Sequence, residues 1–491
     1  MMRSMRMARG VMWGVVAACW PLSAVAADEW DDMRAYIRAG LTEQSVPSIA
    51  VAVAKDGKIL WEQGFGWADR ERRIVATEHT PYSLASISKP LTTTALMTLV
   101  QAGKIDLDRP INDYLGDAKL VARVGDAGDA TVRRVANHTS GLPLHVQFFY
   151  ADEPYARPSP EETILRYGNL VTRPGETYEY SNLGFGVLDH LIERVSGESY
   201  AQFMRSRVFM PLGMTRSSVD IGPGLAAFAA TRYDATGAPL PFYDFDHPGA
   251  SAVFASAHDL VRYGMFHLKA HLRDQQGILS DASIDEMHRR TSGTEDEGYA
   301  IGFQTARRNG YRVVGHTGSM GGVNTQMQLF PDQQLAIVVL SNGRSSLPKT
   351  TFEQLAHKPL PGWPRPANQA VQPQPAFTAV PELTGTWKGT LHTYTRDQPV
   401  AMTFQPGGDI HVRIGEQLTT LVNSARFKDG VLNGVFAARI GTPDTERYDY
   451  TVLLSLRLRG QVLNGSATAV SVRDKARTHA ALAHWLELSK Q

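Results

Sequence analysis

Two side chains that could form an activated nucleophile stand three residues apart in "YSLASISKPLTTTALMTLVQAGKI" (82–105). At this spacing Ser86 and Lys89 fall on the same face of a helix. Pro90 has no N–H to donate and would clash in a helix interior, so we expect the helix to begin near Ser86. The lysine can accept the serine proton if burial lowers its pKa. The alternative is structural, with Ser86 as an N-cap and Lys89 solvated.

The Ser-x-x-Lys spacing is weak evidence when it stands alone. It occurs again in "SLPK", from Ser346 to Lys349. There Pro348 and an expected loop argue against a nucleophile held at a helix start. The pattern therefore needs support from other parts of the chain.

A second motif, Tyr180-Ser181-Asn182, follows a segment rich in Gly and Pro and precedes a predicted helix. It should therefore lie in a loop, where functional residues concentrate. The Tyr180 phenol could relay a proton to a leaving group, and the Asn182 amide could bind a substrate carbonyl and the lysine. The structural alternative is a buried tyrosine followed by an asparagine that caps the helix.

A third motif, "HTGS", covers His316, Thr317, Gly318 and Ser319 on a predicted strand edge. A strand that ends in Gly-rich backbone can line a cleft and offer its N–H groups to an extended substrate. It can also supply one donor of an oxyanion hole. The structural alternative is a strand end with a turn glycine.

The elements that would position these motifs suggest an α+β domain. Apolar residues at helical spacing predict a helix from Asp28 to about Gly40, and two strands should meet in a hairpin at Asp56-Gly57. Strand patterning returns over 311–342, with a turn at Pro331-Asp332. We expect an antiparallel sheet completed by these distant segments, with helices between them.

The C-terminal part of the chain has a different character. Residues 358–381 contain seven prolines and predict a semi-extended linker. Alternating strands and recurrent glycine turns over 382–491 predict a small antiparallel barrel or half-barrel. Trp387 should be a core residue of that barrel.

The three motifs in this order resemble the serine β-lactamase and penicillin-binding-protein family, in the branch of class C β-lactamases, D-alanyl-D-alanine carboxypeptidases, D-aminopeptidases and esterases. The resemblance covers about residues 30–357 and includes "NHTSGLP" (137–143), interpreted as a structural turn with a satisfied His138, and "RPGETYEYSNLGFGVL" (173–188). It implies a β-lactamase/transpeptidase-like domain over 27–357. The roles that it implies are nucleophile for Ser86, proton acceptor for Lys89, general base and acid for Tyr180, substrate binding for Asn182, His316, Thr317 and Gly318, and oxyanion hole for the N–H groups of Ser86 and Ser319.

His316 stands where β-lactamases of this branch usually carry lysine. A histidine with a pKa near ~6.5 is mostly neutral at pH 7, so a substrate carboxylate would depend on Thr317 or an unplaced arginine. The resemblance therefore favours a peptidase, amidase or esterase, with D-amino-acid-containing peptides as the expected substrates. A class C-type β-lactamase and a non-catalytic penicillin-binding module remain the alternatives. The segment 382–491 resembles the lipocalin-like barrel appended to some members, which borders the active site or mediates homo-oligomers.

The first 26 residues have the pattern of a signal peptide, with three arginines, an apolar stretch and "AVA" at the cleavage site. We expect a periplasmic or secreted protein. The alternative is a lipoprotein anchored to the membrane through Cys19, because "VAAC" resembles a lipobox. The net charge of +1 gives no electrostatic attraction to nucleic acid. We expect no cofactor and no metal; His267 and His271 have no glutamate between them as a zinc-protease helix has.

Overall fold

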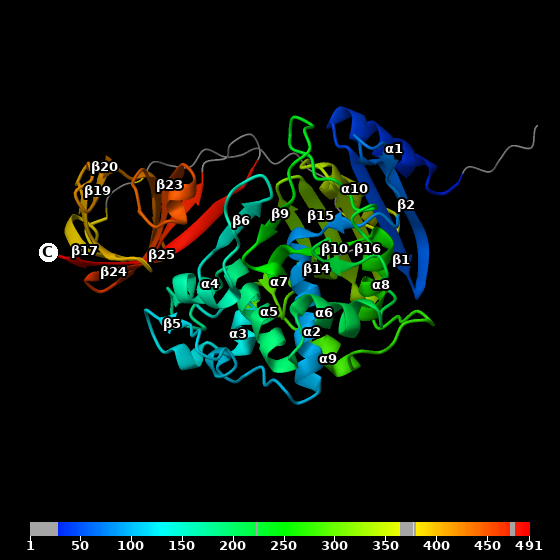
Figure 1. Cartoon of the computed structure of the whole chain (residues 1–491), viewed down its shortest axis with the longest axis horizontal. Coiled ribbons are helices and arrows are strands. Elements are labelled where there is room, and N and C mark those ends of the chain that lie inside the picture. Colours follow the sequence, from blue (N-terminus) through cyan, green and yellow to red (C-terminus); the bar gives the residue numbers. More distant parts are fainter. Residues whose placement is uncertain (1–27, 222–223, 364–376, 378–379, 472–476) are drawn as a thin grey trace, which may run out of the picture.

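A computed structural model of the protein describes residues 28–221, 224–363, 377, 380–471 and 477–491. The predicted signal peptide with Cys19 and most of the proline-rich linker lie outside the described residues. Within them, no helix has the length and apolar character needed to cross a bilayer. Figure 1 shows two parts, a helix-and-sheet body and a barrel of strands beside it.

A nine-stranded sheet forms the centre of the body and joins the two ends of the domain. Its strand order is β11-β12-β13-β14-β15-β16-β1-β2-β3. Every pair in it is antiparallel, and β1 pairs with β16 through residues 49–55 and 335–341. The strands are β1 (Ser48–Lys55), β2 (Lys58–Asp69), β3 (Ile74–Val75), β11 (Ser292–Gly293), β12 (Gly298–Tyr299), β13 (Gln304–Arg308), β14 (Tyr311–Met320), β15 (Val323–Phe330) and β16 (Leu335–Ser341). The predicted hairpin and the predicted pairing of distant segments are confirmed.

Both faces of this sheet are buried, and the sequence of β1 shows why. In "SIAVAVAK" the larger residues Ile49, Val51 and Val53 pack toward helices α1 (Asp31–Glu43) and α10 (Leu347–His357). The alanines between them face the larger core on the other side. Successive side chains of a strand point to opposite faces, so this alternation sorts bulky residues to one layer and small ones to the other.

Helices cover the second face of the sheet and build a helical region beside it (Figure 1). They are α2 (Ser88–Gln101), α3 (Val132–Ala136), α4 (Pro160–Tyr167), α5 (Asn182–Ser196), α6 (Tyr200–Met204), α7 (Pro248–Ser251), α8 (Ala257–His267) and α9 (Asp281–His288). Short strands lie between them: β4 (Tyr82–Ser83), β5 (Val121–Ala122), β6 (Val146–Tyr150), β7 (Asn169–Leu170), β8 (Ser218–Val219), β9 (Tyr243–Phe245) and β10 (Val253–Ala255). The predicted α+β class, with an antiparallel sheet completed by distant segments, is confirmed, and the helices beside the sheet form a helical subdomain.

The C-terminal strands form a nearly closed antiparallel barrel. Their order is β20-β19-β18-β17-β25-β24-β23-β22-β21. They are β17 (Gly385–His392), β18 (Asp397–Phe404), β19 (Ile410–Ile414), β20 (Thr420–Leu421), β21 (Asn423–Lys428), β22 (Val431–Phe436), β23 (Tyr450–Arg459), β24 (Val462–Ser471) and β25 (Ala480–Lys490). Trp387 is fully buried and its indole N–H donates to the Leu383 carbonyl, as expected of a core residue. The prediction of a small all-β barrel is confirmed.

The barrel contacts the body along residues 146–176. Strand β6 in this segment pairs with β25 and with β9, so the barrel sheet continues into the body. Further contacts at the junction include Arg459 with Glu176 at 2.5 Å, Arg477 with Asp152 at 2.8 Å, and the Tyr167 hydroxyl donating to Asp444 at 2.7 Å. The barrel is therefore held by a strand ladder at β6 and by hydrogen bonds and ion pairs to residues that follow β6.

Candidate active site

Ser86 lies in a tight turn immediately before α2. The 3₁₀ turn covers Ala85–Ile87, and α2 begins at Ser88 with Pro90 in its first turn, as predicted. Ala85 has φ +50°, a left-handed conformation that costs a non-glycine residue about 1 kcal/mol or more. Such strain is typical of functional sites, where the surrounding structure imposes it. The turn thus presents Ser86 at the helix start, where unpaired N–H groups and the helix dipole are available.

Lys89 is fully buried and its amine has three hydrogen-bond partners. Nζ lies 2.7 Å from Asn182 Oδ1, 3.2 Å from the Ala250 carbonyl oxygen and 3.2 Å from Ser86 Oγ. Burial lowers the pKa of Lys89 well below its ordinary value, which favours the neutral amine. A neutral amine has two N–H groups and one lone pair. The two carbonyl oxygens can only accept, so the lone pair is left for the hydroxyl proton of Ser86.

Tyr180 lies in the loop before α5 and contacts both Ser86 and Lys89. The Lys89 amine lies 4.7 Å from the centre of the Tyr180 ring. Burial raises the pKa of the Tyr180 hydroxyl, and a hydrogen bond to Ser86 offsets part of the rise. Tyr180 is therefore a neutral phenol near pH 7, suited to passing a proton onward, whereas Lys89 is the better acceptor for the serine proton.

Asn182 is the first residue of α5, and its side chain faces the lysine rather than the helix end. Ser181 caps the helix, because its hydroxyl accepts from the Gly184 N–H. This leaves Asn182 Oδ1 free to accept from Lys89, and the structural alternative of a capping asparagine is wrong. The amide nitrogen remains available to a substrate carbonyl.

His138 holds the Tyr180 loop on both sides. Its carbonyl accepts from the Glu179 N–H at 2.8 Å, and its Nδ1 accepts from the Ser181 N–H at 3.1 Å. Its ring packs on Tyr180 with centroids 4.4 Å apart, and its backbone is left-handed, with φ +62°. The expectation of a satisfied loop histidine is wrong in part, because buried Nε2 has no hydrogen-bond partner among the described residues. His138 thus accepts hydrogen bonds from the residues before and after Tyr180, and we name this arrangement the His138 clamp.

Strand β14 carries "HTGS" along one wall of the site. Its pairing with β13 ends at Gly315, whereas its pairing with β15 continues to Met320. From His316 onward the β13 side of the strand is therefore an open edge, as predicted. A Cβ at Gly318 would overlap the Leu84 carbonyl and the Thr325 hydroxyl, so glycine allows β14 to lie directly against the turn that contains Ser86. Thr317 is half-buried and Ser319 is exposed.

His316 is buried and held by two partners. Its Nδ1 lies 2.7 Å from the Thr317 carbonyl, which can only accept, so Nδ1 carries the proton. Its Nε2 therefore accepts from the Tyr299 hydroxyl at 3.0 Å. Burial, with the nearby Lys89, lowers the pKa of His316 to about 3. The residue is neutral at pH 7, as expected, and neither nitrogen is free to bind a metal.

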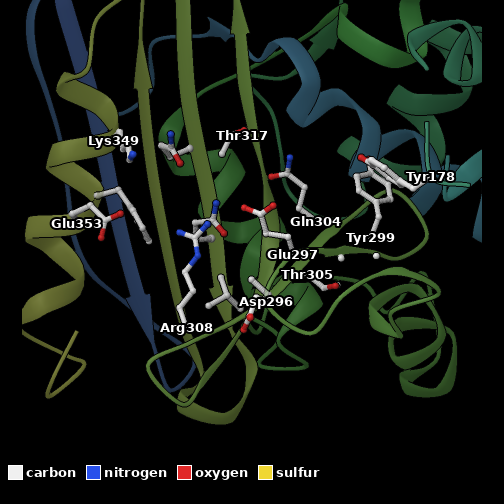
Figure 2. Close-up of a pocket in the computed structure, with 17 residues that line it drawn as sticks. Tyr178, Asp296, Glu297, Tyr299, Gln304, Thr305, Arg308, Thr317, Lys349 and Glu353 are labelled. Carbon is white, nitrogen blue, oxygen red and sulfur yellow. The ribbon is translucent and has the colours of Figure 1, made fainter. Parts of the chain in front are cut away.

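A cavity of about 470 Å³ opens beside Thr317 (Figure 2). Its lining includes Tyr178 and Tyr299 on one side and α10 on the other. Two cations, Arg308 and Lys349, line it together with acidic residues. Neither cationic side chain forms a hydrogen bond or an ion pair with another described residue. Arg308 is the one arginine among the residues that line this cavity with Thr317.

A second cavity, of about 540 Å³, lies between the body and the barrel. Tyr178 lines it as well, with Glu179 from the body and basic residues of the barrel such as Arg426 and Lys428. Tyr178 thus separates two open spaces, one on the sheet side and one on the barrel side. The barrel therefore borders a cavity beside Tyr178 and Glu179, consistent with the hypothesis that it folds back on the body.

The repeated Ser-x-x-Lys pattern at 346–349 also lies at a helix start, contrary to expectation. Ser346 is the N-cap of α10, and Pro348 lies in the first turn of that helix. A proline is tolerated in a first helical turn, so Pro348 permits a helix start in the same way as Pro90. Its hydroxyl donates to Gln44, and Lys349 is exposed in the cavity beside Thr317. Burial of the lysine, rather than the helix start, distinguishes the two patterns.

Comparison with known proteins places this geometry in a family. The Beta-lactamase family model matches residues 33–357. The protein flp of Staphylococcus aureus (strain MRSA252) is 26% identical over 350 residues, 67% of this chain and 66% of the relative, so the match leaves a third of that protein uncovered.

Two solved structures resemble nearly the whole chain, including the barrel. The octameric penicillin-binding protein homologue from Pyrococcus abyssi has a TM-score of 0.59 at 22% identity, covering 93% of this chain and all of that one. The structure of SurE with D-Leu has a TM-score of 0.62 at 21% identity, covering 92% and 99%. These likenesses show a shared fold. With two thirds of its length matched by the family model and the motif residues gathered in one site, the chain belongs to the Beta-lactamase family.

Proposed function

We propose that this protein is a serine hydrolase that forms an acyl-enzyme on Ser86 and cleaves amide or ester bonds of small substrates. The observation that carries the proposal is the buried Lys89 amine, whose two carbonyl partners leave its lone pair to the Ser86 hydroxyl. A buried, neutral lysine within hydrogen-bond reach of a strained serine turn is an arrangement for nucleophilic catalysis. A solvated lysine beside an N-cap, the structural alternative, does not fit full burial.

In the proposed acylation, Ser86 Oγ attacks the substrate carbonyl carbon while its proton passes to Lys89. In this proposal the developing oxyanion accepts hydrogen bonds from the N–H groups of Ser86 and Ser319. As the bond to the leaving group breaks, Tyr180 donates its proton to the departing nitrogen or oxygen and is reprotonated from Lys89. Water then attacks the acyl-enzyme, gives a proton to the same relay, and Ser86 is released with its hydroxyl restored.

The open edge of β14 and the state of His316 favour an extended peptide over a β-lactam. Thr317 and the residues after it can pair with a substrate backbone in the manner of an added strand. The neutral His316 supplies no positive charge beside the nucleophile, so a substrate carboxylate would be bound further away, by Arg308 and Lys349. SurE, a neighbour of the same fold, was solved with D-Leu. Together these observations support D-amino-acid-containing peptides as the first substrates to test.

Export is part of the same proposal. The N-terminal pattern of arginines, apolar residues and "AVA" supports a periplasmic or secreted protein, and membrane attachment would require lipidation of Cys19. The octameric Pyrococcus relative makes self-association worth measuring by light scattering. Fractionation of cells that express the full chain, followed by N-terminal sequencing, would test both alternatives for the leader.

Intact-protein mass spectrometry after incubation with a fluorophosphonate tests the nucleophile. We expect one adduct on the wild type, none on Ser86→Ala, and an undiminished adduct on Ser346→Ala, which removes the serine of the matching pattern. An adduct that persists in Ser86→Ala would overturn the assignment, and no adduct on any form would favour a non-catalytic binding module.

Substrate class is tested separately, with D-Ala-D-Ala peptides, D-aminoacyl amides, p-nitrophenyl esters and a chromogenic cephalosporin. We expect the peptides and esters to be hydrolysed faster than the cephalosporin. The reverse ranking would make the protein a class C-type β-lactamase.

A further inference from the structure

A second group of side chains with potential ligand chemistry lies on the body, formed by Glu62, His79 and His258. Glu62 is on β2, His79 is in the loop before β4, and His258 is the second residue of α8. One donor atom from each lies within 4.8 Å of the other two. The residues are up to 196 positions apart in sequence, so no local motif reveals them.

The backbone beneath these residues is fixed. The Thr77 N–H donates to the Thr80 hydroxyl at 2.9 Å, and the His79 N–H donates to the Thr77 hydroxyl at 3.2 Å. A Cβ at Gly64 of β2 would overlap the backbone of Thr77, so the turn rests directly on the strand. The His258 N–H donates to the Glu78 carbonyl, which ties the start of α8 to the same turn. The three side chains therefore project from a preorganised surface.

The side-chain geometry suits an ion between them. His258 Nδ1 lies 2.8 and 3.1 Å from the two carboxylate oxygens of Glu62. The rings of His79 and His258 stand edge to face with centroids 4.7 Å apart. Two ligand atoms on a tetrahedral Zn²⁺ are separated by about 3.3 Å, given bonds of ~2.0–2.2 Å. An ion could thus replace the Glu62–His258 hydrogen bond with only small side-chain shifts.

A simple ion pair explains less of this arrangement. It accounts for Glu62 and His258 but gives no role to His79, which brings a second imidazole to the same place and would repel His258 if both were charged. The side chains are 24%, 25% and 48% exposed for Glu62, His258 and His79, so an ion and its water ligands can reach them. Glu78 Oε1, 3.6 Å from His79 Nε2, adds a further oxygen at the rim.

We propose that Glu62, His79 and His258 bind a zinc-type divalent cation, with water completing its coordination. Two imidazoles and one carboxylate are a ligand set that favours Zn²⁺ over Mg²⁺ or Ca²⁺. The ion would join β2, the 77–80 turn and α8. The 77–80 turn leads into β4, which directly precedes the nucleophile turn, and α8 directly follows β10, the strand that pairs with β4. The ion would therefore join elements that support the nucleophile turn. The effect expected of the ion is on stability, and the inference is independent of the proposed hydrolase activity.

Isothermal titration of the untagged full chain with ZnCl₂, after removal of metal by a chelator, tests the site. We expect one saturable site per chain and a rise in the thermal unfolding midpoint on adding Zn²⁺. His79→Ala and His258→Ala should each weaken binding by about tenfold or more, whereas His271→Ala, which removes an exposed histidine elsewhere, should not. Absence of saturable binding, or equal binding in all four proteins, would overturn the proposal.

A second measurement on the wild type avoids dependence on variant folding. Diethylpyrocarbonate acylates accessible histidines, and the modified peptides are identified by mass spectrometry. Zn²⁺ should protect His79 and His258 and leave the modification of His271 unchanged. Modification of the two site histidines at the same rate with and without Zn²⁺ would refute the inference.

Discussion

Replacing His138 tests whether the His138 clamp positions Tyr180. In His138→Ala the Ser181 N–H, in a residue only 2% exposed, loses its acceptor. An unsatisfied buried donor costs about 1–3 kcal/mol. If this free-energy cost opposes the placement of Tyr180 that acylation needs, it adds to the activation barrier, and the rate of acylation falls about 5- to 150-fold. The Asn variant is the matched control, because Asn Oδ1 occupies the place of the imidazole Nδ1 and asparagine tolerates the left-handed backbone.

The assay is the rate at which a fluorophosphonate or a hydrolysable ester acylates Ser86, measured beside circular dichroism and the unfolding midpoint. We expect His138→Asn to keep most of the rate that His138→Ala loses. If the Ala variant acylates at the wild-type rate, the clamp has no positioning role. If the Asn and Ala variants are equally slow while both remain folded, the ring packing on Tyr180 matters and the hydrogen bond does not.

Four further predictions address other parts of the structure. Lys89→Met should lower acylation by about 10²–10⁴-fold with little loss of stability, and a mass-spectrometric rate near that of the wild type would contradict its role as base. Gly318→Ala should abolish acylation, because its Cβ would force β14 away from the nucleophile turn; a crystal structure with β14 unmoved would contradict this. Arg459→Ala removes the contact with Glu176 and should slow acylation a few-fold, while the free energy of unfolding in urea falls by only about 1 kcal/mol. An unchanged rate would show that this contact of the barrel does not affect the site. The free energy of unfolding should fall as the pH is lowered from about 6.5 to 3, because burial lowers the pKa of His316 to about 3 and only the unfolded chain takes up a proton in that range. Urea midpoints that do not fall with pH, or that fall equally in His316→Asn, would refute this.

Local rules of chain geometry allowed several features to be predicted from sequence. Pro90 restricts the helix start to the residues just before it, and Asp56-Gly57 takes the two left-handed conformations of a tight hairpin. Such features depend on a few neighbouring residues. They were therefore accessible without knowledge of the tertiary structure.

The features that were missed depend on contacts between distant segments. The role of His138 depends on its left-handed backbone and on a hydrogen bond from the Ser181 N–H, 43 residues away, to its Nδ1. Neither feature is visible in "NHTSGLP". The sequence context predicts a loop at Ser346, whereas the structure starts a helix there, with Pro348 in the first turn as Pro90 is in α2. What separates the two serine–lysine pairs is burial of Lys89, a property of the assembled core. The interpretation of Ser86 as a nucleophile depends on the two motifs downstream, since spacing alone does not distinguish it from Ser346.

The position of the barrel gives it a mechanical connection to the site. The segment that begins at His138 and ends at Tyr180 leaves the active site, pairs with β25 through β6, and returns past Glu176, where Arg459 of the barrel contacts it. Every barrel contact with this segment therefore restrains a loop whose two ends are joined by the His138 clamp. A loop anchored at its middle has fewer conformations to lose when its ends come together, so docking of the barrel lowers the entropic cost of placing Tyr180. On this argument the barrel can influence catalysis without touching substrate, and the second cavity adds a route by which it could also contact one.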